Sequence, residues 1–94
     1  MYYVYIIQSL DADRKLYYGY TSNLRQRMEQ HNAGKGCKTT KSRQWRLVYY
    51  ESYISEADAR QREQKIKRGN ANRHLLARIS HSLLSEISEA EALR

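Results

Sequence analysis

Two residues with strongly polar side chains lie on a stripe where a helix would place apolar ones. Positions 24, 27, 28 and 31 share one helical face, and Arg27 and His31 occupy it beside Leu24 and Met28. An arginine can stabilise charge that develops on a phosphoryl group, and a histidine can orient water or carry a proton. The alternative is that both side chains lie at the edge of the stripe and extend into water.

A carboxylate takes a similar position in a second expected helix. Glu63 shares a face with Ala59 and Ile66. Burying half of a carboxylate is costly unless a cation balances it, and one carboxylate can hold a hard divalent ion whose other ligands are water. The alternative is a structural ion pair, for which Arg27 is a candidate partner. Together with nine tyrosines in the chain, these polar positions indicate metal-assisted hydrolysis of a phosphodiester.

The net charge of +7 is concentrated in the middle of the chain. Residues 35–74 carry eleven basic and four acidic side chains. Such a surface is typical of a polyanion partner, although a solvated face that keeps the protein soluble is the alternative. The polar loop 35–44 would lie beside the proposed site and hold the substrate backbone. Its basic residues are Lys35, Lys38, Lys41 and Arg43.

The length and composition predict one soluble domain. The chain has 94 residues, of which 40% are hydrophobic and 29% are charged. No segment approaches the ~18 apolar residues that a membrane helix needs, and the N-terminus lacks the features of a signal peptide. Cys37 is the only cysteine, so no internal disulfide is expected. We therefore expect a cytoplasmic protein with no membrane partner.

The hydrophobic periodicity predicts an α+β fold, a three-stranded antiparallel sheet flanked by helices in the order ββαβαα. Gly19 within a strand predicts a bulge or a close approach to the backbone. We expect residues 1–80 to form the main domain and residues 81–94 to be a helical extension of it. The expected elements are strands at 2–8 and 16–21, a helix from 22–23 to about 32, a strand at 45–53, a helix from 55 to about 68, and an amphipathic helix from 71 to 90, continuous or broken near 80–82.

The order of these motifs resembles the GIY-YIG nuclease superfamily, and within it the small stand-alone bacterial members similar to the N-terminal domain of excinuclease C. The resemblance covers roughly residues 2–76. Five segments carry it: Tyr3-Val4-Tyr5, Tyr17-Tyr18-Gly19, LRQRMEQH, GKGCKTTKSRQWRLVYYE and RQREQKIK.

The resemblance implies a DNA endonuclease that uses one Mg²⁺ or Mn²⁺ ion and no small-molecule cofactor. Both functional tyrosines of the family are present, whereas Tyr3, Val4 and Tyr18 replace other family residues. Several family nucleases also carry an asparagine after the glutamate, a role assigned here to neither Asn70 nor Asn72. The implied roles are general base or water positioning for Tyr5, phosphate or water support for Tyr17, close backbone approach at Gly19, phosphate stabilisation by Arg27, assistance by His31, and metal binding by Glu63.

Three functions follow as hypotheses. The first is a metal-dependent endonuclease that acts on DNA in repair or processing. The second is a nucleic-acid-binding module of the same fold in which catalysis is weak or lost. The third is a partner-dependent protein whose last helix docks onto a second copy or onto another protein.

Overall fold

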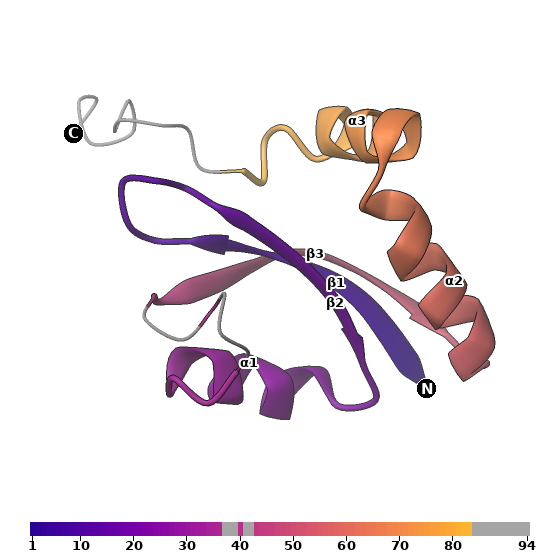
Figure 1. Cartoon of the computed structure of the whole chain (residues 1–94), viewed down its shortest axis with the longest axis horizontal. Helices are drawn as coiled ribbons and strands as arrows, with labels where there is room; N and C mark the ends of the chain where they lie inside the picture. Colours follow the sequence, from indigo (N-terminus) through magenta and orange to yellow (C-terminus); the bar gives the residue numbers. More distant parts are fainter. Residues whose placement is uncertain (37–39, 41–42, 84–94) are drawn as a thin grey trace.

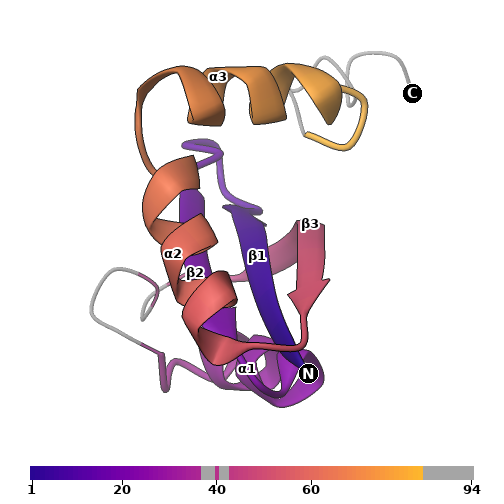
Figure 2. The same ribbon diagram turned by 90° about the vertical axis from the view of Figure 1, so that its right-hand side faces the viewer.

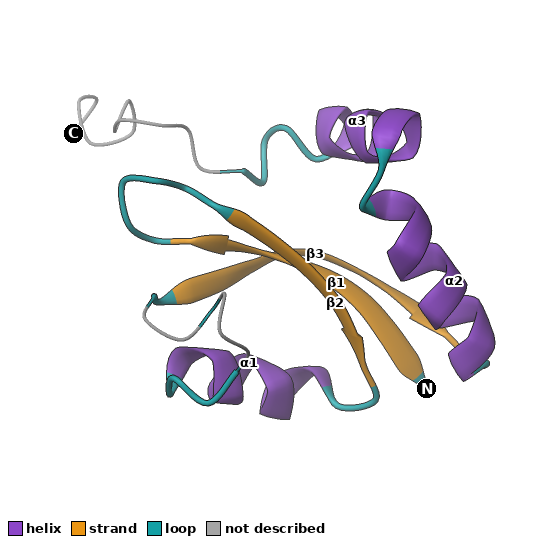
Figure 3. Ribbon diagram, in the orientation of Figure 1, coloured by secondary structure: helices purple, strands orange, loops and turns teal. Residues whose placement is uncertain are grey.

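The structure is a computed structural model that describes residues 1–36, 40 and 43–83. It is an α+β fold, as the periodicity predicts, with three strands and three helices in the described residues (Figures 1 and 3). The elements are β1 (Tyr2–Ser9), β2 (Leu16–Thr21), α1 (Leu24–Asn32), β3 (Trp45–Tyr53), α2 (Glu56–Ile66) and α3 (Gly69–Arg78).

The three strands form one antiparallel sheet in the order β2-β1-β3. The central strand β1 is buried from residue 4 to residue 9, which explains why its sequence is apolar without alternation. Tyr5 lies opposite Gly19, and Ile7 lies opposite Tyr17. Because successive side chains point to opposite faces of a strand, Tyr5 and Tyr17 share one face of the sheet.

Each face of the sheet has its own core. On one face, β1 and β3 contribute Tyr5, Ile7 and Trp45, against which α1 packs. On the other face, the core is formed mainly by α2, α3 and the alternate residues of β1 and β3, and its buried members are Val4, Ile6, Val48, Ala59, Ile66 and Leu75. In Figure 1, α1 lies on one side of the sheet and α3 on the other, and Figure 2 shows α2 running alongside β2 and β1.

Local signals in the sequence account for the ends of α1. The Asn23 side chain accepts a hydrogen bond from the Gln26 amide at the start of the helix. At its end, Gly34 has a φ of +76°, the left-handed conformation that glycine adopts at little cost. The Gly34 and Lys35 amides donate to the carbonyls of His31 and Gln30, which is the Schellman arrangement. The helix therefore ends at Asn32, one residue after His31.

The second half of the chain differs in detail from the predicted boundaries. Helix α2 ends at Ile66, and α3 begins at Gly69, two residues before the expected Ala71. A φ of +51° at Gly69 lets the chain turn between the two helices. Helix α3 ends at Arg78. Ile79 and Leu83 of the expected apolar stripe follow the helix and pack against the core, whereas Ile87 and Ala90 lie outside the described residues.

Gly19 does not lie at a bulge. The register shift of the sheet is between Ile6 and Ile7, on the side of β1 that pairs with β3. In the part of the chain that the structure describes, no helix has the length and apolar character needed to cross a bilayer.

Candidate active site

A chain of three buried side chains joins β1, α1 and the loop that follows α1. The Tyr5 hydroxyl lies 2.9 Å from Nε2 of His31, and Nδ1 of the same ring lies 3.0 Å from Oγ1 of Thr40. The exposed fractions are 0% for Tyr5, 2% for His31 and 0% for Thr40. Because both ring nitrogens are engaged, the imidazole has a defined orientation and hydrogen-bonds directly to the phenol.

The environment of this ring favours its neutral form. Burial lowers the pKa of His31, and the nearby positive charge of Arg27 lowers it further. In a neutral imidazole one nitrogen donates and the other accepts. The ring can therefore accept a hydrogen bond from the Tyr5 hydroxyl and donate one to the Thr40 hydroxyl, or the reverse.

A second tyrosine lies against the same imidazole. The ring of Tyr17 meets His31 edge-on at 5.4 Å between centroids, and Trp45 lies 6.4 Å from Tyr17. Tyr17 is half-buried, unlike Tyr5, so it lies nearer the surface of the same cluster of side chains. The two tyrosines of the sequence motifs are thus brought together around one histidine.

Two glycines leave room for this cluster. A Cβ at Gly19 would lie 2.6 Å from the Tyr5 hydroxyl oxygen, so the close approach predicted at this glycine is present. A Cβ at Gly36 would lie 2.6 Å from Nδ1 of His31 and would also overlap the Thr40 hydroxyl. Neither Gly36 nor Thr40 was singled out by the sequence, where both fall in an aperiodic polar loop.

Arg27 lies where the two helical layers meet at the β2 edge of the sheet. It lines an open depression of about 410 Å³ together with Tyr20 and Thr21 of β2 and Glu56 at the start of α2. This depression therefore joins α1 to α2 around the exposed edge of β2. A guanidinium in this position can contact a phosphate that lies along the edge.

Glu63 belongs to the layer on the other face of the sheet. It is 7% exposed, and it is buried on α2 with Ala59 and Ile66, which pack in the core opposite Tyr5. Its Oε2 atom forms an ion pair with Nζ of Lys67 at 2.8 Å. The cation that balances this carboxylate is thus its neighbour one turn along α2, and not Arg27.

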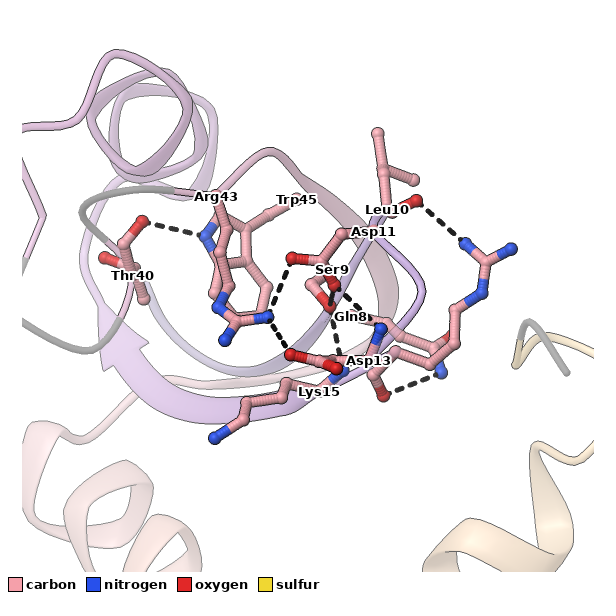
Figure 4. A network of polar contacts seen from close by, with 10 residues as sticks. Gln8, Ser9, Leu10, Asp11, Asp13, Lys15, Thr40, Arg43 and Trp45 are labelled. Atoms are coloured by element: carbon pink, nitrogen blue, oxygen red, sulfur yellow. Dashed lines mark hydrogen bonds and ion pairs between the residues drawn. The ribbon is translucent and has the colours of Figure 1, made fainter. Parts of the chain in front are cut away.

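The basic loop is only partly described. Lys35 is exposed after α1, whereas Lys38 and Lys41 lie outside the described residues. Arg43 precedes β3 and is held against the β1–β2 turn, where its guanidinium is 2.7 Å from Asp11 and 3.1 Å from Asp13 (Figure 4). Much of its charge is therefore neutralised within the protein.

Of the two asparagines near the expected glutamate helix, Asn72 contacts the sheet. Its Oδ1 atom accepts a hydrogen bond from the Tyr18 hydroxyl at 3.2 Å. Asn70 is exposed at the start of α3. This contact ties α3 to β2, on the face of the sheet that carries Glu63.

The sheet, the two motif tyrosines and the helix that carries Arg27 and His31 can be compared with those of known proteins. Residues 1–75 match the family model described as the GIY-YIG catalytic domain. The chain therefore belongs to the GIY-YIG family, which confirms the resemblance seen in its motifs.

Its curated relatives are small proteins of the group named UPF0213. One from Clostridium perfringens is 39% identical over 92 residues, which are 97% of each chain. One from Staphylococcus haemolyticus is 48% identical over 66 residues, which are 69% of this chain and 78% of the relative. A UPF0213 protein of Bacillus halodurans, solved by NMR in solution, is 32% identical with a TM-score of 0.50, over 84% of this chain and 85% of the other.

Proposed function

We propose that this protein is a divalent-metal-dependent endonuclease that hydrolyses phosphodiester bonds of DNA. The observation that carries the proposal is the buried Tyr5–His31–Thr40 chain, with Tyr17 against the same imidazole. This chain holds one imidazole between the two tyrosines of the sequence motifs, and the family to which the protein belongs is one of nucleases. We further propose a role for it in DNA repair or processing.

In this proposal the two tyrosines and the histidine manage the proton of the attacking water. His31, held neutral by its surroundings, accepts a hydrogen bond from the Tyr5 hydroxyl and so makes the phenol oxygen a better acceptor. Tyr17, nearer the surface, positions the water or the phosphate. Arg27 neutralises charge that develops on the phosphate oxygens at the edge of β2.

Glu63 is the carboxylate that would hold a metal ion, one that keeps most of its water, and it lies across the sheet from Tyr5. In the described part of the chain no three histidine, cysteine, aspartate or glutamate side chains come together, so a cage made only of protein ligands is absent there. Glu63 would be the ligand, since Mg²⁺ is often bound through one or two carboxylates plus water. Lys67, whose side chain is 45% exposed, pairs with that carboxylate and would move aside into solvent. When bound, such an ion polarises a phosphate oxygen and lowers the pKa of coordinated water.

The test is cleavage of plasmid, flapped and branched DNA in the presence of Mg²⁺ or Mn²⁺, and again with a chelator. We expect cleavage that the chelator abolishes, and a loss of at least tenfold in rate in Arg27→Ala and in Glu63→Gln. Asp58→Asn is the matched control, because it neutralises an exposed carboxylate of the same helix. Wild-type rates in both Arg27→Ala and Glu63→Gln would rule out the proposed site.

A second function, DNA binding without efficient cleavage, is favoured by the position of Glu63. Its carboxylate is buried on the face of the sheet opposite Tyr5 and is already balanced by Lys67. A protein of this kind would bind DNA in a strongly salt-dependent manner. It would leave every substrate of the panel intact with either metal.

A further inference from the structure

Two accessible aromatic residues continue the Tyr5 face of the sheet beside the N-terminal end of α1. Tyr50 lies opposite Tyr5 in the register between β1 and β3, and Tyr3 lies two residues before Tyr5 on β1. All three side chains therefore share one face. Tyr5 is fully buried, whereas Tyr50 is 54% exposed and Tyr3 is half-buried.

These two rings form the aromatic wall of an open depression of about 360 Å³. Their centroids are 6.0 Å apart, and the planes meet at 65°, in an edge-to-face contact that orients each ring. The other lining residues are Ser22, Asn23, Leu24 and Arg25. The depression thus combines two ring surfaces, a guanidinium and small hydrogen-bonding groups, and no carboxylate lines it.

Arg25 supplies a positive charge that the protein does not neutralise. In the described residues no carboxylate lies within ion-pair distance of its guanidinium, and its side chain is exposed. The depression places the exposed Tyr50 ring beside an arginine with which no described carboxylate pairs. This is the combination that binds a nucleotide, because the ring stacks on the base and the guanidinium contacts the phosphate.

We infer that this depression binds an unpaired nucleobase of the DNA strand, next to the phosphate at the proposed active site. The inference rests on the proposed function for the identity of the polymer. Tyr3 and Tyr5 are two residues apart, about 7 Å along the strand, so the base would be a near neighbour of the reacting phosphate. The interior bases of a duplex present no free face to a tyrosine ring, and single strands, gaps and flaps do.

The experiment measures binding in a chelator, so that no cleavage occurs. Fluorescence anisotropy gives Kd for a labelled single strand, for the corresponding duplex and for the same duplex with a single-stranded flap. We compare wild type with Tyr50→Leu, which removes the aromatic ring, and with Tyr50→Phe, which keeps it. Ile54→Ala is the control for an exposed apolar residue outside the depression, since Ile54 is 87% exposed.

We expect Tyr50→Leu to raise Kd for the single strand and the flap about tenfold, as loss of one base–aromatic stack does. Tyr50→Phe and Ile54→Ala should stay within twofold of wild type, and Kd for the duplex should change little in any variant. An unchanged Kd for the single strand in Tyr50→Leu, or an equal loss on duplex and single strand, would overturn the inference. Circular dichroism checks that each variant is folded.

A photochemical cross-link provides an independent measurement. A single strand that carries 5-iododeoxyuridine, irradiated with the wild-type protein, should cross-link at Tyr50 or Tyr3, and mass spectrometry identifies the peptide. Cross-links only at other residues would contradict the inference. If no metal supports cleavage, the endonuclease proposal is wrong and the base site still stands. If the protein cleaves DNA but Tyr50→Leu binds the single strand as wild type does, the base site is wrong and the endonuclease proposal still stands.

Discussion

The Tyr5–His31 hydrogen bond is the contact on which the candidate site depends. Both groups are buried, so removing the Tyr5 hydroxyl would leave Nε2 of His31 away from water and without this hydrogen bond. A polar contact of this kind stabilises the fold only as long as it is complete. Residue-level substitutions should therefore change stability and activity together, and suitable controls can separate the two.

Tyr5→Phe removes only the hydroxyl from this contact. The ring still fills the core, but Nε2 of His31 is left buried without its partner. We expect the free energy of unfolding to fall by about 1–3 kcal/mol and cleavage to fall at least tenfold. Urea denaturation and a plasmid cleavage assay measure the two effects. Unchanged cleavage in a folded Tyr5→Phe protein would exclude the phenol from the reaction.

The lowered pKa of His31 predicts a defined dependence of stability on pH. In the unfolded chain a histidine titrates near pH 6.5, whereas in the folded protein His31 resists protonation because it is buried beside Arg27. Between these two pKa values the unfolded state binds more protons, so stability rises with pH there. The contribution of His31 is complete above about pH 6.5 and is lost as the pH falls below that value.

Thermal unfolding measured from pH 8 to pH 5 checks this dependence. Wild-type Tm should fall as the pH is lowered through this range, and His31→Gln should show a shallower fall, because glutamine keeps a hydrogen-bonding group and does not titrate. Equal slopes for the two proteins would mean that His31 is not the group responsible.

Gly19→Ala tests the space around the Tyr5 hydroxyl. The new methyl group would lie 2.6 Å from that oxygen, so either the ring or strand β2 has to shift. We expect a loss of about 1–3 kcal/mol in the free energy of unfolding, as for other overpacked cores, together with reduced cleavage. Stability equal to wild type would show that Tyr5 moves freely, contrary to its burial.

At the scale of elements, a polar cluster fastens β3 to α2. The Glu51 carboxylate accepts hydrogen bonds from the hydroxyls of Tyr49 and Tyr53 at 2.5 and 2.6 Å, and two nitrogens of Arg62 donate to it at 2.9–3.2 Å. Burial would raise the pKa of Glu51, but bonds from Arg62 and the tyrosines lower it overall. Burial, together with the hydrogen bond and the negative charge of Glu51, raises the pKa of Tyr53 to about 12.

A double-mutant cycle of Glu51→Gln and Arg62→Met should measure the strength of this connection. We expect a coupling energy of about 1–2 kcal/mol, because both side chains are less than one-third exposed and the contact is bidentate. The matched control is the Glu56–Arg60 pair on the surface of α2, at 3.6 Å, for which we expect about 0.3–0.5 kcal/mol. Equal coupling in the two cycles would contradict this assignment.

At the scale of the whole molecule, the excess of positive charge should control DNA affinity. The net charge is +7, and each phosphate contact releases counterions, so log Kd should rise linearly with log salt concentration. Arg25→Gln should lower the slope of log Kd against log salt concentration by about 0.9, the value for one phosphate contact. Arg43→Gln should not change it, since Asp11 and Asp13 already pair with Arg43. A reduced slope for Arg43→Gln would show that this pairing is broken on the DNA.

Much of the fold could be predicted from the sequence because its signals are local. The apolar run of β1, the caps at Asn23 and Ser55 and the positive φ at Gly34 all depend on neighbouring residues. The family could also be recognised from the sequence, because its short motifs occur in the expected order along the chain. The predicted start of α3 at Ala71 is wrong by two residues, because Gly69, which was expected only to end the preceding helix, also begins the next one.

The partners of the polar side chains could not be read from the sequence. Tyr5 and His31 are 26 residues apart, and Thr40 lies in a loop without any pattern. The exception is the ion pair of Lys67 with Glu63, an i, i+4 contact that helical periodicity alone can indicate. That Glu63 lies across the sheet from Tyr5 depends on which face α2 covers. Periodicity determines which side chains of one helix or strand lie together, whereas the packing of layers alone decides which of those groups meet, because such contacts join segments that are distant along the chain.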